Sequence, residues 1–183
     1  MYTTDHFYDL LGKNKLQEAQ MELEFLKNNP IIQREYANCL ADWFLFQRDY
    51  KPALKIKKQF LNIHFSACHG FPHHNFPAIL RQCYARHLTK DFTLLSKVYI
   101  AMKKPLNHLF DRERLFPAAK DLSDISLIYH QMRNWDEAIR ARVWKILIYP
   151  EISDCQLLIR LVKYANRHQD ITNIVQFVNQ HLD

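Results

Sequence analysis

Glycine is almost absent from this sequence, which contains only Gly12 and Gly70 among its 183 residues. A Walker phosphate loop, a dinucleotide-binding fingerprint and a nucleophile elbow each need several glycines close together. A β-sandwich or β-barrel also needs glycine in many of its turns. We therefore expect none of these structures. Apolar residues at steps of three and four predict amphipathic helices instead.

Long apolar runs and closely spaced cysteines are missing as well. No stretch of about 18 apolar residues occurs, so we expect no membrane-spanning helix. The first residues lack the basic region and apolar run of a secretory signal. The cysteines form no C-x-x-C pair and are Cys39, Cys68, Cys83 and Cys155. A disulfide framework is not expected, and reduced thiols in the cytoplasm fit this usage best.

Basic residues exceed acidic ones without forming a basic tail. The chain has 25 Lys and Arg against 19 Asp and Glu, a net charge of +6. Residues 1–91 hold 12 basic and 9 acidic side chains, and residues 92–183 hold 13 and 10, so each part carries +3. An evenly spread excess indicates solubility and a mild preference for acidic partners, whereas tails that grip nucleic acid or anionic lipid concentrate their charge.

One short pattern recurs: a polar turn, a large apolar residue, and three positions later a small or apolar residue on a helix. A two-helix hairpin cannot bury its apolar face alone, so such hairpins stack on one another. We expect the large residue to wedge between the two helices, and the small residue to let them approach closely. The large residues are Leu16, Tyr50, Phe92, Trp135 and Ile171, and the residues three positions later are Ala19, Ala53, Leu95, Ala138 and Ile174.

The large residues are 34, 42, 43 and 36 positions apart, so the two middle intervals are long for one hairpin. Helix-breaking residues fall in both of these intervals. They are Gly70, Pro72 and Pro77 in the first, and Pro105 and Pro117 in the second. Because proline and glycine interrupt helices, we expect loops near residues 66–77 and 103–120.

The recurring pattern resembles the tetratricopeptide repeat. The best copy consists of Leu122, Ile125 and Tyr129 on its first helix, Trp135 at the turn, Ala138 on its second helix, and Pro150 after it. The copy before it that matches well keeps Phe44, Tyr50, Ala53 and Phe60. Ala41 and Ser126 stand where the family has a glycine on the first helix. The resemblance implies an all-α, right-handed solenoid of about five antiparallel helical hairpins, with residues 1–183 as a single domain.

In a stack of this kind the first helix of each hairpin lines the concave surface, so polar side chains on first helices are candidates for partner contacts. Arg160, Lys163 and Arg167 follow one another at steps of three and four, which would place them on one helix face. Such a basic stripe could hold a carboxylate or an acidic peptide. The candidate partner-binding residues are Asn38, Asp42, Arg81, Tyr84, His130, Arg160, Lys163 and Arg167.

Histidine is concentrated in residues 64–87, which hold five of the ten histidines of the chain. His64 and Cys68 are four positions apart, as are His69 and His73, and this spacing brings two ligands to one face of a helix. A zinc site needs about four converging ligands. A glycine and a proline separate the second pair, so a polar loop with solvated histidines is the favoured interpretation and a metal site the alternative.

These patterns favour a non-enzymatic interaction module, an adaptor or chaperone that holds a peptide or helix of another protein in a concave groove. We expect no catalytic residues and no cofactor. A nucleic-acid-binding helical-repeat protein is the first alternative, disfavoured because acidic residues are interspersed with the basic ones. A metal-binding protein that uses residues 64–87 is the second. Exposed apolar surface at the terminal hairpins could also support a homodimer.

Overall fold

The computed structural model describes residues 4–28, 33–67, 92, 95–97, 99–100 and 112–182. Within these residues the chain forms helices and no β-strand, which confirms the predicted all-α class. The chain divides into two compact units, residues 1–57 and residues 58–183. None of the described helices is both long enough and apolar enough to span a bilayer.

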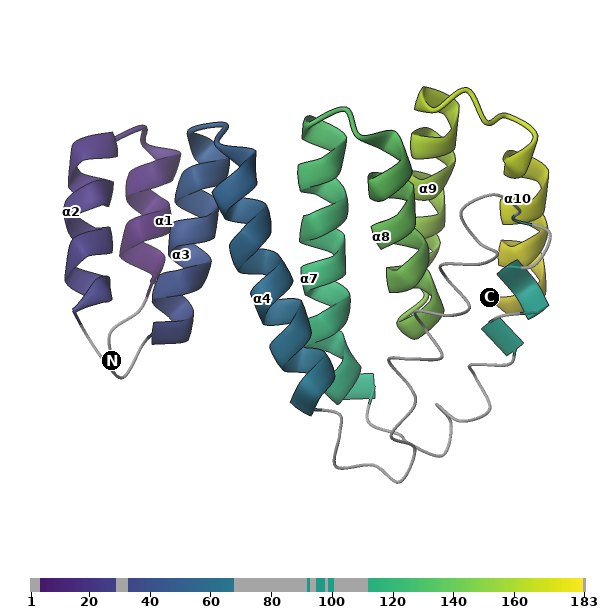
Figure 1. Cartoon of the computed structure of the whole chain (residues 1–183), viewed down its shortest axis with the longest axis horizontal. Helices are drawn as coiled ribbons and strands as arrows, with labels where there is room; N and C mark the ends of the chain where they lie inside the picture. The colour runs from purple at the N-terminus through teal and green to yellow at the C-terminus, as the bar shows by residue number, and fades with distance from the viewer. Residues whose placement is uncertain are drawn as a thin grey trace. The chain divides into compact units, whose positions relative to one another are not determined.

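The first unit is built from short amphipathic helices. Helices α1 (Asp5–Gly12), α2 (Leu16–Lys27) and α3 (Gln33–Phe46) pack together, with α2 in contact with both α1 and α3, and α4 (Tyr50–Ala67) begins in this unit (Figure 1). Apolar residues recur at steps of three and four on α1 and α2, so each buries one face. The core residues of this unit are Phe7, Leu10, Leu11, Ala19, Leu23, Leu26, Cys39 and Trp43.

The second unit contains the end of α4 and two further helical hairpins. Its helices are α7 (Arg112–Gln131), α8 (Trp135–Ile148), α9 (Ile152–Tyr164) and α10 (Asp170–His181). Helix α8 packs against both α7 and α9, and most of its side chains are buried for this reason. Fully buried side chains of this unit include Ile128, Ile139, Ile146, Leu158 and Phe177.

One backbone turn occurs four times, between the two helices of each described hairpin. Asn14, Arg48, Arg133 and Asn166 each lie two positions after the last residue of the first helix and have φ of 58°, 61°, 57° and 57°. In the first turn, the amide of Asn14 donates to the carbonyl of Leu11 at 3.0 Å, and the next amide donates to the carbonyl of Leu10 at 2.9 Å. The other three turns make the same two bonds. This pair of bonds is the Schellman motif, which satisfies the last carbonyls of a helix.

The small residues of the recurring pattern are its most buried members. Ala19, Ala53 and Ala138 are each 0% exposed, which allows the two helices of a hairpin to approach closely. The large residues are not uniformly buried: Leu16 is 38% exposed, so the expectation that each of them plugs its turn is wrong at this position. The reason is its place as the first residue of α2, because helical side chains tilt towards the N-terminus and here towards the open end of the turn.

The predicted loop near residues 103–120 is wrong in its second half. Helix α7 begins at Arg112 and contains Pro117. A proline there removes one hydrogen bond, to the carbonyl four residues before it, close to the start of a 20-residue helix. The buried Ala118 and Ala119 that follow hold this part of α7 in the core. The predicted loop near residues 66–77 also starts late, since α4 continues to residue 67, and its remainder lies outside the described residues.

Described residues of the third copy of the pattern contact α10, the last helix of the chain. His64 Nδ1 on α4 lies 2.5 Å from Asp121 Oδ2 on α7, so the end of α4 packs directly on α7 (Figure 1). Tyr99, from the third copy, is buried and its ring lies 5.2 Å from that of Phe177 on α10. A stack that followed the order of the sequence would have placed this segment between α4 and α7. Burial of the Tyr99 ring against Phe177 and His181 favours the position seen here.

Candidate functional site

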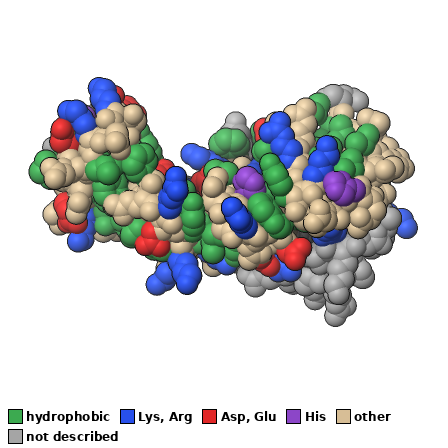
Figure 2. All heavy atoms as spheres, turned by 90° about the horizontal axis from the view of Figure 1, so that it is seen from above, with side chains coloured by type: hydrophobic (Ala, Val, Ile, Leu, Met, Phe, Trp, Pro, Cys, Tyr) green, Lys and Arg blue, Asp and Glu red, His purple; other side chains and the backbone are tan. Residues whose placement is uncertain are grey.

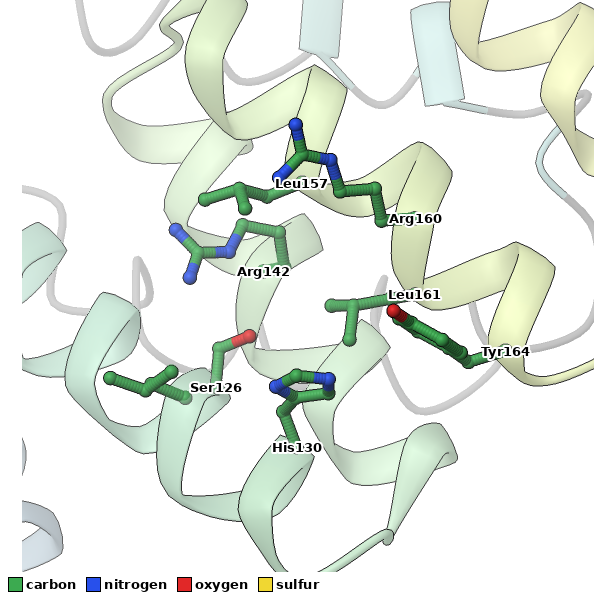
Figure 3. Close-up of a pocket in the computed structure, with 8 residues that line it drawn as sticks. Ser126, His130, Arg142, Leu157, Arg160, Leu161 and Tyr164 are labelled. Carbon is green, nitrogen blue, oxygen red and sulfur yellow. The ribbon is translucent and has the colours of Figure 1, made fainter.

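A pocket of about 210 Å³ lies in the second unit and draws its walls from three helices. Helices α7 and α9, the first helices of two successive hairpins, supply most of the lining, and α8 supplies one arginine. The lining residues are Ser126, Leu127, His130, Arg142, Leu157, Arg160, Leu161 and Tyr164 (Figure 3). A volume of this size accommodates one or two side chains of a ligand, not a large cofactor.

Three apolar side chains of the pocket are exposed to solvent. Leu127 is 51%, Leu157 is 39% and Tyr164 is 57% exposed. Figure 2 shows hydrophobic side chains beside Lys, Arg and His side chains on the visible face of the second unit. Grouped apolar surface rimmed by polar residues is typical of binding sites, so the pocket offers apolar contact area to a ligand.

Tyr164 is held in position by two other rings. It stacks on Trp135 with ring centres 5.3 Å apart, and the ring of His130 lies 5.6 Å from Tyr164 and 5.3 Å from Trp135. Aromatic contacts of this kind stabilise a pair by roughly 0.5–1.5 kcal/mol beyond area burial. The cluster joins the turn between α7 and α8 to the end of α9, and it fixes one wall of the pocket.

The opposite wall carries positive charge. Figure 3 shows Arg142 and Arg160 on the side of the pocket opposite His130. Arg160 is exposed and forms no ion pair with any residue in the described ranges. Arg142 is only 5% exposed, and its buried Nε has no hydrogen-bond partner among the described residues. A buried N–H without an acceptor is costly, so this wall favours an anionic or hydrogen-bond-accepting group.

Arg142 is positioned by a buried network at the start of α9. Its Nη1 donates to Asp154 Oδ1 at 2.5 Å and to Ser123 Oγ at 3.0 Å. Lys145 pairs with the same Asp154 and, at 2.5 Å, with Glu151 Oε2. The neighbouring Cys155 has its pKa raised to about 11, mainly by burial and further by the charge of Asp154. The guanidinium is therefore fixed before any ligand arrives.

The structure brings together two of the residues that the sequence singled out. His130 and Arg160, from separate first helices, both line the pocket. Lys163 is exposed on α9 beyond the lining. Arg167 does not share their helix face, because α9 ends at Tyr164. Its Nε instead pairs with Asp170 at 2.7 Å, so the predicted three-residue stripe is wrong at this end.

Asn38 and Asp42 lie in the first unit and are engaged within it. Tyr8 donates its hydroxyl to Asp42 Oδ2 at 2.9 Å. Buried Lys57 Nζ lies 3.8 Å from Asp42 Oδ1 and 3.5 Å from Asn38 Oδ1. Burial, and then the charge of Asp42, raises the pKa of Tyr8 above its usual range, and burial raises the pKa of Cys39 to about 11. This cluster ties α1, α3 and α4 together.

The structure describes only some of the remaining candidate residues. Arg81 and Tyr84 lie outside the described residues, as do Cys68, His69 and His73 of the metal alternative. His64 is described, and its ring forms the pair with Asp121 and stacks on Phe60 at 6.4 Å. Within the ranges that the structure describes, no three His, Cys, Asp or Glu side chains gather as a metal site would require.

Sequence reasoning missed the residues that give the pocket its apolar rim and its buried charge. Leu127, Leu157 and Tyr164 read as ordinary helix positions in the sequence. Arg142 had a detectable signal, because it follows Trp135 by seven positions, just as Lys57 follows Tyr50 by seven. A cation at the same place in two copies of the pattern indicates a shared position within the hairpin.

Comparison of the chain with family models, with curated proteins and with solved structures finds no match.

Proposed function

We propose that this chain is a non-enzymatic helical-repeat adaptor or chaperone of the tetratricopeptide type. Its pocket between α7 and α9 holds a peptide or helix of another protein that carries an acidic side chain next to an apolar one. The observation that carries the proposal is the pocket itself, where exposed Leu127, Leu157 and Tyr164 adjoin the exposed Arg160 and the buried Arg142.

The repeated backbone supports the helical-repeat part of the proposal. Four described hairpins have the same Schellman turn, and three place a fully buried alanine three residues after the start of the second helix. In a tetratricopeptide-like stack the first helices line the binding surface, and α7 and α9 are first helices. The pocket thus lies where such proteins contact their partners.

The chemistry of the pocket favours a protein ligand over a nucleic acid. Arg142 shares the carboxylate of Asp154 with Lys145, and Arg160 is the exposed arginine of the pocket, with the exposed Lys163 beyond the lining. Nucleic-acid binding draws on many phosphate contacts, whereas one arginine beside leucine and tyrosine suits one carboxylate in an apolar segment.

Synthetic helical peptides that combine Asp or Glu with Leu, Met or Phe test the proposal by fluorescence anisotropy. We expect binding that requires the acidic residue, and we expect Arg160→Glu to weaken it by at least about tenfold because a like charge replaces the ion-pair partner. Arg140→Glu is the matched control, since Arg140 is an exposed arginine of α8 outside the pocket.

Equal binding of peptides without acidic residues, or equal loss in the two arginine variants, would contradict this assignment. Binding of an RNA or DNA oligonucleotide that falls steeply with salt would favour the nucleic-acid alternative.

A further inference from the structure

Helix α2 presents an apolar face with an acidic border. Met21 is 66% and Phe25 is 48% exposed, and their spacing of four places them on one side of the helix. Glu18, Glu22 and Glu24 lie on either side of them on the helical wheel. The exposed surface of this helix therefore combines two large apolar side chains with three carboxylates.

The carboxylates of α2 are weakly engaged. Glu18 pairs with Lys15 at 3.0 Å and Glu24 with Lys27 at 3.5 Å, and all four side chains are about half exposed or more. Exposed pairs of this kind contribute little to stability. Glu22 forms no ion pair with any residue that the structure describes. These glutamates can therefore turn to another cation with little loss.

The pocket of the second unit has the same kind of surface with the opposite charge. Its exposed apolar side chains are leucines and a tyrosine, and the exposed cations beside them are Arg160 and Lys163. An amphipathic helix that lays its apolar face into a groove is a common recognition mode. Complementary charges at the borders of the two surfaces would fix its orientation.

We infer that α2 of one copy of this chain docks into the α7–α9 pocket of a second copy. Met21 and Phe25 would cover the apolar rim, and Glu18 or Glu22 would meet Arg160. The contact joins two different surfaces, so each copy offers one α2 and one pocket to other copies. This inference rests on the proposed function, because it names the acidic helix that the pocket receives.

Charge reversal on either surface, followed by mixing, tests the inference by sedimentation velocity. We expect the wild-type chain to self-associate at about 100 µM, a concentration that saturates a contact of micromolar affinity. Arg160→Glu alone and the pair Glu18→Lys with Glu22→Lys should each weaken association by at least about tenfold. Arg140→Glu, the control with the same charge change, should associate as the wild type does.

An equimolar mixture of the two reversed variants is the decisive sample. The Arg160→Glu chain retains an intact α2, and the Glu18→Lys, Glu22→Lys chain retains an intact pocket. The two reversed surfaces also carry opposite charges, so the mixture should regain association. Far-UV circular dichroism of each variant checks that it is folded. A monomeric wild type, association that survives in either reversed variant, or a mixture that stays monomeric would overturn the inference.

The outcome separates this inference from the proposed function. A chain that stays monomeric yet binds acidic peptides through Arg160 would reject docking of α2 while the peptide-binding pocket stands. Failure of both experiments would reject the pocket as a binding site.

Discussion

The α3–α4 and α7–α8 hairpins bury a cation at the same position and neutralise it differently. Lys57 follows Tyr50 by seven residues, Arg142 follows Trp135 by seven, and they are 3% and 5% exposed. Each cation reaches a polar side chain twelve residues before that aromatic residue, Asn38 at 3.5 Å and Ser123 at 3.0 Å. The repeat thus extends to a buried cation that spans its two helices.

The two hairpins differ eight residues before the aromatic residue. The α3–α4 hairpin has Asp42 there, within reach of Lys57. The α7–α8 hairpin has Leu127, so Arg142 takes its carboxylate, Asp154, from the next hairpin. In the α3–α4 hairpin the carboxylate of Asp42 occupies this position and engages the buried cation. In the α7–α8 hairpin the same position holds the exposed Leu127, which lies beside the arginines of the pocket. The difference between Asp42 and Leu127 thus separates a structural cluster from the proposed binding pocket.

The largest expected effect of this difference is on stability. Asp154→Asn leaves Arg142 and Lys145 buried without their shared carboxylate, and we expect a loss of about 3–5 kcal/mol in the free energy of unfolding. Asp42→Asn should cost roughly 1 kcal/mol, since the side chain of Asp42 is 33% exposed and water screens the pair. Urea denaturation followed by circular dichroism measures both, and equal losses would contradict the comparison.

We expect an intermediate effect, on ligand binding, when the α7–α8 hairpin receives a carboxylate at the position that corresponds to Asp42 of the α3–α4 hairpin. Leu127→Asp places a carboxylate beside Arg142 and Arg160, and this carboxylate would compete with the acidic group of a ligand. We expect binding of acidic peptides to fall by about tenfold, or about 1.4 kcal/mol. Leu127→Ala, which removes only apolar contact, should have a smaller effect in the same anisotropy titration. Equal losses would show that the new charge is irrelevant.

The smallest expected effect distinguishes the residues with positive φ at the turns. Arg48→Gly and Arg133→Gly should each stabilise the protein by roughly 0.5–1 kcal/mol, because glycine adopts the left-handed conformation without the steric cost that other residues bear. Asn14→Gly and Asn166→Gly should gain less, since asparagine tolerates this conformation. Thermal unfolding of the four variants ranks them, and a destabilised arginine variant would contradict the interpretation of the turn.

Features that depend on neighbouring residues were predictable from the sequence, and features that depend on distant contacts were not. The hairpins follow from local apolar spacing, and Ala19, Ala53 and Ala138 occupy the close approaches that their size suggested. Helix α9 ends at Tyr164, and Asn166 makes the turn that follows. Since no glycine or proline marks this end in the sequence, the apolar spacing wrongly predicts that Arg167 lies on the same helix.

The site was predictable only in part for the same reason. His130 and Arg160 were identified because each is a polar residue on a first helix. The guanidinium of Arg142 is held in place by Asp154, a residue of another hairpin, and no local sequence pattern predicts that pairing. The exposure of Leu127, Leu157 and Tyr164 depends on how α7, α8 and α9 pack against one another, and the sequence does not show this packing.

The contact between the segment around Tyr99 and α10 has a consequence for protein synthesis. Ser96 Oγ donates to Gln180 Oε1 at 3.2 Å across 84 positions of sequence. Tyr99 leaves the ribosome well before α10, whose Phe177 packs against its ring, has been made, because the chain is synthesised from its amino terminus. The Tyr99 side chain therefore lacks these neighbours in the nascent chain, and a chain truncated before α10 would leave its ring without them.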